Sequence, residues 1–323
     1  MSDDAEPPLP ARTSAALRAA QLYYMQDLTM EAIARELGTS RSSVSRLLTF
    51  ARDTGLVDIR IRSPLEASTA LEGQIARRFD VAAHIVPVPD HTSDVDRLAR
   101  VALSTARMLD RFVDATMTVG IAWGSTMSAI SRVLVPLQRP GIRVVQLNGA
   151  GNTRTTGVDY ASEILRRFGD AFGASIEQFP VPAFFDDRAT KTAMWRERST
   201  RRVLDLQRSM DVALFSVGSP LAQVPSHVYM GGYLERSDYD SLGRDRVVGD
   251  VATVFFRADG SWRDVELNAR ASGPGFDVLA RVPRRVCVVS GAAKARSLRG
   301  ALAAGVVTDL VLDEGAAREL VAL

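Results

Sequence analysis

Two turns of the sequence combine small, hydroxylated and basic residues in a way that suits a phosphate group. Gly124, Ser125 and Thr126 follow one apolar run, and Gly291 and Lys294 follow another. Backbone N–H groups at a helix start attract anions, and a lysine beside them would add a charged hydrogen bond. Neither turn is a Walker loop or a nucleophile elbow, because the motifs Gly-Lys-Ser/Thr and Gly-x-Ser-x-Gly are absent. The simpler alternatives are plain helix capping by Ser125 and Thr126 and a solvated surface role for Lys294.

Lysine is rare in this chain. Of 40 lysine and arginine residues, only Lys191 and Lys294 are lysines. A high-GC genome is the simplest explanation of this bias. Where base composition replaces most lysines by arginine, the lysines that remain more often have a role that arginine cannot fill.

Three further turns offer groups that could bind sugar hydroxyls. Asn148 and Gly149 follow the run 143–147, Gly218 and Ser219 follow 212–217, and Asp250 stands in a Val-Gly-Asp turn. An amide side chain both donates and accepts hydrogen bonds, and a carboxylate accepts them, so both suit a polyol. The alternative for Asp250 is an ordinary turn or N-cap aspartate.

The N-terminal part has the spacing of a helix-turn-helix. A helix over 17–25 precedes a second one that Thr29 caps and Gly38 ends, and a third over 41–53 that Thr39 or Ser40 caps. The outward residues at the start of the third helix would then meet base edges and phosphates. The candidate DNA-binding residues are Thr29, Thr39, Ser40, Arg41, Ser42, Ser43, Ser45 and Arg46.

Local charge supports this interpretation. Between residues 41 and 62 there are five arginines against two acids, whereas residues 1–40 hold three arginines against six acids. Because the whole chain carries a net charge of only +2, nucleic-acid binding must come from such a local patch. The alternative is a three-helix packing module with a solvated arginine face.

The rest of the chain alternates short β-rich runs with amphipathic stretches, which predicts a doubly wound α/β domain. The expected strands are 84–88, 117–122, 143–147, 212–217, 251–256, 285–289 and 309–312, and the expected helices are 93–110, 125–134, 159–172, 191–209 and 295–304. We expect a disordered tail over 1–11, a helix-turn-helix domain over 12–63 and the α/β domain over 64–323, with the linker at Ser63-Pro64.

Composition excludes several classes of protein. The 323 residues are 46% apolar and 24% charged, which is typical of globular proteins rather than disordered or fibrous ones. The chain has no membrane-length apolar run, and its acidic N-terminus is unlike a signal peptide. A single cysteine, Cys287, forms no internal disulfide, and the three histidines show no metal-binding spacing. We therefore expect a cytoplasmic protein with no membrane partner, no metal and no cofactor.

The helix-turn-helix segment and the ligand-type turns described above together resemble those of the SorC family of bacterial sugar-responsive transcriptional regulators. The segment from Tyr23-Tyr24 to Ile59 is similar to the family's DNA-binding segment, above all in Leu37-Gly38-Thr39-Ser40-Arg41-Ser42-Ser43-Val44-Ser45-Arg46-Leu47-Leu48. The resemblance continues through Trp123-Gly124-Ser125-Thr126, Gly249-Asp250 and Gly291-Ala292-Ala293-Lys294, which occur in the order of the family's effector domain. That domain is related to sugar-phosphate isomerase and glucosamine-phosphate deaminase folds. The resemblance implies a sugar-phosphate site at Gly124, Ser125, Thr126, Asp250, Gly291 and Lys294.

The sequence departs from the family pattern at two positions. The last turn commonly has two successive glycines, and Ala292 replaces the second, so its methyl group could narrow the approach of a phosphate. The deoxyribonucleoside-type regulator has a lysine at the position of Asn148, where it forms a Schiff base with the sugar aldehyde. An asparagine forms no imine, so covalent capture is not expected there.

These inferences predict a DNA-binding regulator whose affinity for its operator is controlled by a sugar phosphate or polyol. One recognition helix reads only a half-site, so we expect a dimer or tetramer. The alternative is an isomerase- or deaminase-type enzyme with an accessory helix-turn-helix, in which Asp250 would be the general base. A structural adaptor without a ligand is the third and least favoured hypothesis.

Overall fold

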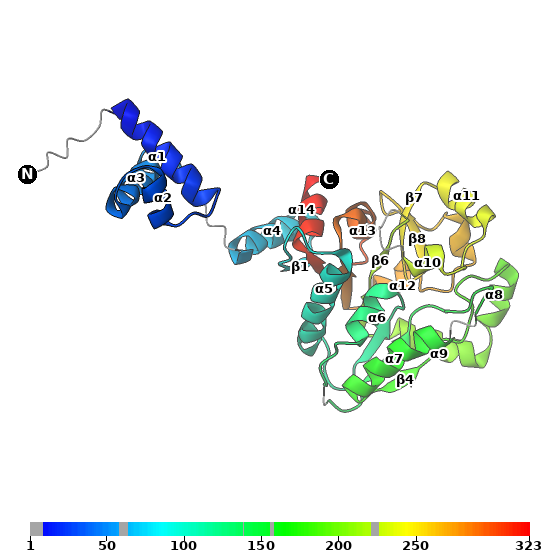
Figure 1. Cartoon of the computed structure of the whole chain (residues 1–323). Helices are drawn as coiled ribbons and strands as arrows, with labels where there is room; N and C mark the ends of the chain where they lie inside the picture. Colours follow the sequence, from blue (N-terminus) through cyan, green and yellow to red (C-terminus); the bar gives the residue numbers. More distant parts are fainter. Residues whose placement is uncertain (1–8, 58–63, 138, 156–157, 221–225) are drawn as a thin grey trace, which may run out of the picture. The chain divides into compact units, whose positions relative to one another are not determined.

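The computed structural model describes residues 9–57, 64–137, 139–155, 158–220 and 226–323 (Figure 1). Contacts along the chain separate two compact units, Met1–Ser63 and Pro64–Leu323. Residues 1–8 of the predicted tail lie outside the described residues, as do Arg60, Arg62 and Ser63 of the predicted basic segment and linker.

The first unit is a bundle of three helices: α1 (Leu9–Tyr24), α2 (Met30–Glu36) and α3 (Arg41–Asp53). Its small core contains Leu22, Ile33, Val44 and Leu48. The prediction of a tail over 1–11 is wrong for its last three residues, because α1 begins at Leu9. Pro10 is compatible with this start, because N–H groups in the first turn of a helix have no partner within the helix and proline's missing N–H is therefore not needed there.

The caps that the sequence predicts are present. The Thr29 hydroxyl accepts a hydrogen bond from the N–H of Ala32, and the Ser40 hydroxyl accepts one from Ser43. Gly38 follows α2 with φ of +63°. These groups satisfy N–H donors that would otherwise be unpaired at the helix starts, and they fix the turn between α2 and α3.

The second unit is built on a parallel sheet of seven strands in the order β1-β10-β9-β5-β2-β3-β4. The strands are β1 (Ala82–Val86), β2 (Thr118–Ile121), β3 (Arg143–Gln146), β4 (Ser175–Glu177), β5 (Val212–Phe215), β9 (Arg284–Val289) and β10 (Asp309–Asp313). A small antiparallel sheet, β6 (Val217–Gly218), β7 (Val247–Val251) and β8 (Val254–Arg257), continues from the end of β5.

Alternate residues of each central strand enter two different cores. Val212 and Leu214 of β5 pack on one face of the sheet, whereas Ala213 and Phe215 pack on the other. Side chains of a strand point to opposite faces in turn, so this division shows that both faces are covered. This is the doubly wound α/β architecture that the sequence predicts.

Helices α5, α6 and α7 supply one core, and α4, α12, α13 and α14 supply the other. Their bounds are α4 (Pro64–Phe79), α5 (Asp94–Met108), α6 (Ser125–Ser131), α7 (Val158–Phe172), α12 (Phe276–Leu279), α13 (Ala295–Ala303) and α14 (Glu314–Ala322). The remaining helices are α8 (Arg188–Met194), α9 (Arg198–Arg208), α10 (His227–Met230), α11 (Arg236–Arg244) and the 3₁₀ turns η1 (Leu109–Arg111), η2 (Glu266–Ala269) and η3 (Ala292–Lys294). No described helix is long and apolar enough to cross a membrane.

Three element predictions are wrong. The expected strand 251–256 spans the hairpin between β7 and β8, whose turn residues Ala252 and Thr253 have φ of +47° and +70°. No glycine or asparagine occupies this turn, so no local residue pattern predicts it. The expected turn at Asp250 is part of strand β7, and the expected helix 191–209 is two helices, α8 and α9.

Candidate functional site

The predicted ligand-binding turns converge at the carboxyl edge of the large sheet. Strands β2 and β5 are neighbours, but the chain leaves β2 toward β3 on one side and leaves β5 toward β9 on the other. Such a reversal opens a crevice outside the strand ends, where α/β sheets bind ligands. The residues after β2, β5 and β9 meet at this crevice.

A first cleft of about 230 Å³ brings together the two phosphate-type turns. We call it the Lys294 cleft. Ser125 and Thr126 line one side, and Gly291 and Lys294 line the other. Its further wall contains Asp90, Asp94, Arg97, Leu98, Ser290, Ala292, Ala293 and Gly315.

Lys294 is a buried cation, not the solvated surface lysine of the simpler alternative. The residue is only 7% exposed, and its ammonium group makes no hydrogen bond or ion pair with any residue that the structure describes. Burial lowers the pKa of its ammonium group, which the nearby Cys287 and Asp250 partly oppose. A buried charge without a partner is costly, so this position favours binding of an anion.

The turn that carries Lys294 is held by Asp313, which is fully buried at the end of β10. The Asp313 carboxylate accepts hydrogen bonds from the N–H of Gly291 at 2.6 Å and the N–H of Ala316 at 3.1 Å, and it pairs with Arg97 at 3.1 Å. Gly291 has φ of +94°, a conformation that side chains disfavour. Ala292 is exposed and has no positive φ, so its methyl group causes no backbone strain.

Ser125 and Thr126 do not cap their helix. The N-cap of α6 is Gly124, and no side-chain hydrogen bond closes its first turn. The Thr126 hydroxyl instead lies 3.3 Å from that of Ser216, which follows strand β5. Ser125 and Thr126 also line a second, narrower cleft of about 40 Å³, and Lys294 lines both clefts.

This second cleft, the Asp250 cleft, contains polar atoms that lack partners. Asn148 Oδ1 is buried without a hydrogen-bond partner in the described part of the chain. Asp250 Oδ1 and the Tyr229 hydroxyl are also buried and lie near each other, but they make no hydrogen bond of good geometry with each other or with another described residue. Buried polar groups normally pair, so unpaired ones beside a cleft mark where a ligand's hydroxyls would bind. Gly124, Gly218 and His227 also line this cleft.

Asp250 is held in place by its neighbours in the small sheet. It pairs with Gly218 across β6 and β7, and its Oδ2 accepts a hydrogen bond from the N–H of Thr253 at 3.2 Å. A Cβ atom on Gly218 would lie 1.8 Å from Asp250 Oδ1, so only glycine leaves room for the carboxylate. Burial raises the pKa of Asp250 to about 6, and Lys294 acts in the opposite direction.

An aromatic wall borders the Asp250 cleft. The Trp123 ring stacks on Tyr233 with centroids 5.0 Å apart, and His227 stacks on Tyr160 at 4.6 Å. The indole N–H of Trp123 donates to the carbonyl groups of Asn148 and Gly149. Trp123 therefore ties the turn after β2 to the turn after β3.

Two predicted effector residues lie outside both clefts. Gly149 is a packing residue, because a Cβ there would lie 2.2 Å from the carbonyl oxygen of Val181. The backbone N–H of Ser219 donates to the Ser226 hydroxyl, and its side chain is buried. Conversely, sequence reasoning did not single out Tyr229 or Asp313. Asp313 could have been found as the acid that ends an expected strand, whereas nothing in the sequence marks Tyr229.

On the first unit, the candidate DNA-binding residues form one polar surface at the start of α3. Ser42, Ser45, Arg41 and Arg46 are exposed, as are Thr39 and Ser40. Arg41 pairs with Glu31 of α2 at 2.9 Å, and the hydroxyls of Ser42 and Ser43 lie within 3.0 Å of the Ser40 hydroxyl. The hydroxyls of Thr29 and Ser40 also cap α2 and α3, so these two residues stabilise the fold as well.

The described residues contain no group of three or more His, Cys, Asp or Glu side chains placed to hold a metal ion.

Comparison with known proteins identifies the family. A family model described as "Putative sugar-binding domain" matches residues 63–322. The deoxyribonucleoside regulator of Bacillus subtilis is 31% identical over 94% of this chain and 96% of its own length. The chain belongs to the SorC family of sugar-binding transcriptional regulators.

Solved structures agree with this assignment. A domain of "a possible sugar-binding transcriptional regulator" from Arthrobacter aurescens is 54% identical, covers 80% of this chain and all of its own, and superposes with a TM-score of 0.75. The full-length sorbitol operon regulator SorC of Klebsiella pneumoniae shares the fold, with a TM-score of 0.71 at 23% identity over 96% of this SorC-family chain and 99% of its own. The relatives are transcriptional regulators rather than enzymes, so the isomerase or deaminase alternative for Asp250 is not supported.

Proposed function

We propose that this regulator binds operator DNA through α3 and that a sugar phosphate in the Lys294 and Asp250 clefts controls that binding. The observation that carries the proposal is the buried Lys294 ammonium group, which has no partner among the described residues and faces both clefts. A phosphate is the complementary ligand group, since it would supply the missing charge and hydrogen bonds.

The two clefts suggest an orientation for the ligand. The phosphate would lie in the Lys294 cleft, against the backbone at Gly291 and the Ser125 and Thr126 hydroxyls. The carbon chain would extend into the Asp250 cleft, where Asn148 and Asp250 have unpaired oxygens that accept hydrogen bonds from hydroxyl groups. Because Asn148 forms no imine, binding would be reversible and non-covalent.

On the DNA side, the start of α3 would enter the major groove. Arg41 and Arg46 would contact guanine or phosphate, and the serines would allow close approach. Each chain would read one half-site, so specific binding would require a dimer or higher oligomer. The ligand would regulate only by binding the DNA-competent and DNA-incompetent assemblies with different affinities.

A thermal-shift screen of sugars, polyols and their phosphates tests the proposal, with wild type and Lys294→Ala compared side by side. A ligand that binds the native state raises the melting temperature by mass action. We expect a phosphorylated compound to stabilise the wild type and to lose that effect in Lys294→Ala. Stabilisation by an unphosphorylated polyol alone, unchanged in the variant, would refute the assignment of the phosphate to Lys294.

A further inference from the structure

The second of the two lysines, Lys191, lies in a different cleft from Lys294. This cleft has a volume of about 360 Å³ and is lined by Arg188, Lys191, Thr192, Trp195, Trp262, Arg263, Asn268 and Ala269. It combines three cations with two indole rings, and no carboxylate lines it. None of its residues lines the Lys294 or Asp250 clefts.

The Lys191 ammonium group is half-buried and poorly compensated. Its Nζ donates to the carbonyl oxygen of Asn268 at 3.3 Å and lies 5.4 Å from the centroid of the Trp195 ring. Burial and the neighbouring charge of Arg188 lower its pKa to about 8. The Arg263 guanidinium lies 5.0 Å above the Trp262 ring and has no ion pair within the described ranges.

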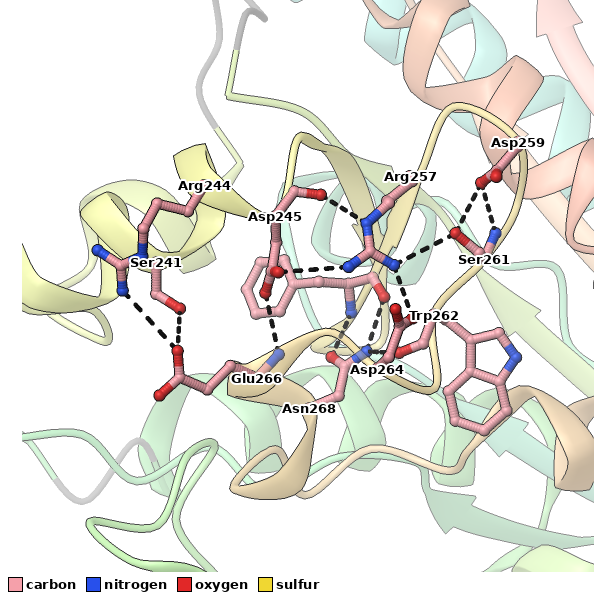
Figure 2. Close-up of polar contacts among 11 residues, drawn as sticks. Ser241, Arg244, Asp245, Arg257, Asp259, Ser261, Trp262, Asp264, Glu266 and Asn268 are labelled. Carbon is pink, nitrogen blue, oxygen red and sulfur yellow. Dashed lines mark hydrogen bonds and ion pairs between the residues drawn. The ribbon is translucent and has the colours of Figure 1, made fainter.

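The acidic residues near this cleft in the sequence are engaged elsewhere (Figure 2). Asp264 pairs with Arg257 at 2.7 Å, and Glu266 accepts from the Ser241 hydroxyl at 2.8 Å. On the other side, Asp187 caps α8 through Thr190. The cleft therefore keeps a local excess of positive charge, because its three cations form no ion pair with a carboxylate of the described residues.

The framework of the cleft is fixed by hydrogen bonds. The Asn268 side chain accepts from the N–H of Phe255 and donates to the carbonyl groups of Phe255 and Trp262. Arg257 donates to Ser261 of the same segment and to Asp245, which ends helix α11 (Figure 2). These bonds hold the Asn268 carbonyl toward Lys191. A rigid site loses little entropy when a ligand binds, which favours recognition of small molecules.

We propose that this cleft is a second ligand site, separate from the effector clefts, which takes a small anion carrying a planar or apolar group. The anionic group would bind Lys191, Arg188 and Arg263, and the planar group would lie against Trp195 and Trp262. The volume is within the usual range of about 300–1,000 Å³ for small-molecule sites. The proposal does not depend on the identity of the effector or on DNA binding.

Tryptophan fluorescence of the full chain tests this proposal, because two of its three tryptophans line the cleft. The probe is phenyl phosphate, titrated at constant ionic strength in a phosphate-free buffer, with inorganic phosphate compared as the same anion without a ring. We expect saturable quenching by phenyl phosphate and weaker binding of inorganic phosphate. The Kd should rise about tenfold or more in Lys191→Gln and in Arg263→Gln, because each removes a charged hydrogen bond.

Two control variants locate the binding. Arg281→Gln, which removes an exposed arginine outside the cleft, should leave the Kd unchanged, and a titration in a Lys294→Ala background, whose effector clefts lack the buried cation, should still show saturable quenching. Quenching that does not saturate overturns the proposal. Quenching that is lost in Lys294→Ala but kept in Lys191→Gln also overturns it, since the probe would then occupy the effector clefts. Circular dichroism checks the fold, and the exposed Arg263 provides the test if Lys191→Gln does not fold.

Discussion

Replacing Gly218 by alanine tests whether Asp250 is held as the structure shows. A Cβ at this position would lie 1.8 Å from Asp250 Oδ1 and 2.8 Å from its Cγ, so the carboxylate must move. Moving it breaks the 3.2 Å hydrogen bond from the N–H of Thr253 and overpacks a buried site. Overpacking costs about 1–3 kcal/mol and the hydrogen bond about 1 kcal/mol, so we expect a loss of stability of about 2–4 kcal/mol.

Urea unfolding at neutral pH measures this loss, and Gly243 provides a matched control. Gly243 is in helix α11, where an added Cβ meets nothing within 4 Å. Gly243→Ala should therefore be neutral or stabilising by up to about 1 kcal/mol.

A double-mutant cycle separates the clash from any other effect of the alanine. In an Asp250→Ala background the clash is gone, so Gly218→Ala should cost less than about 1 kcal/mol, and the two substitutions should be strongly coupled. Two results would refute the clash with Asp250. One is a Gly218→Ala stability equal to that of Gly243→Ala, and the other is the same loss of stability on Gly218→Ala with and without the Asp250 carboxylate.

Substitutions at Asp250, Asp313 and Ser40 have further expected outcomes, with Ser45 as the control for Ser40. The pKa of Asp250 is raised from 3.8 to about 6 in the folded protein, so the folded state binds the proton more tightly. The contribution of Asp250 to stability is thus fully present below about pH 4 and is lost as the pH rises through 6, a change on the order of 3 kcal/mol. Asp250→Asn should remove this pH dependence of the free energy of unfolding, measured with urea. A variant whose stability varies with pH as the wild type's does would contradict this assignment to Asp250. Asp313→Asn should lower stability by about 3 kcal/mol or more, because Arg97 then loses its buried partner; a melting temperature equal to wild type would contradict this. Ser40→Ala should cost about 1 kcal/mol through loss of the α3 cap, whereas the exposed Ser45→Ala should stay within about 0.5 kcal/mol, as thermal melts of the two variants would show.

The sequence predicted the elements that have strong local signals. Helix α3 has the predicted bounds because Ser40 caps it and its apolar residues recur at helical spacing. Strands β2, β3, β5, β9 and β10 were found because their apolar runs are buried on both faces. Strand β4 was missed because it has only three residues and stands at the edge of the sheet.

The candidate site was predicted where glycine, hydroxyl and lysine residues follow strands, as at Gly124 and Lys294. Long-range packing decided the rest. Gly149 has the same turn signature, but the chain near Val181 covers it. Tyr229 of the short helix α10 lies beside Asp250, and no local pattern predicts where its hydroxyl lies. The Ala252-Thr253 turn is stabilised by contacts from Asp250 and Gly273, so its residue types do not reveal it.

The most direct test of the account measures operator affinity with and without the sugar phosphate identified by the thermal-shift screen. Fluorescence anisotropy on the operator, at one fixed salt concentration, would compare wild type with Lys294→Ala. We expect the ligand to change the operator Kd of the wild type by about fivefold or more, the lower end of usual allosteric coupling, and to leave the operator Kd of Lys294→Ala unchanged. An equal response in both proteins, or no response in the wild type, would contradict it.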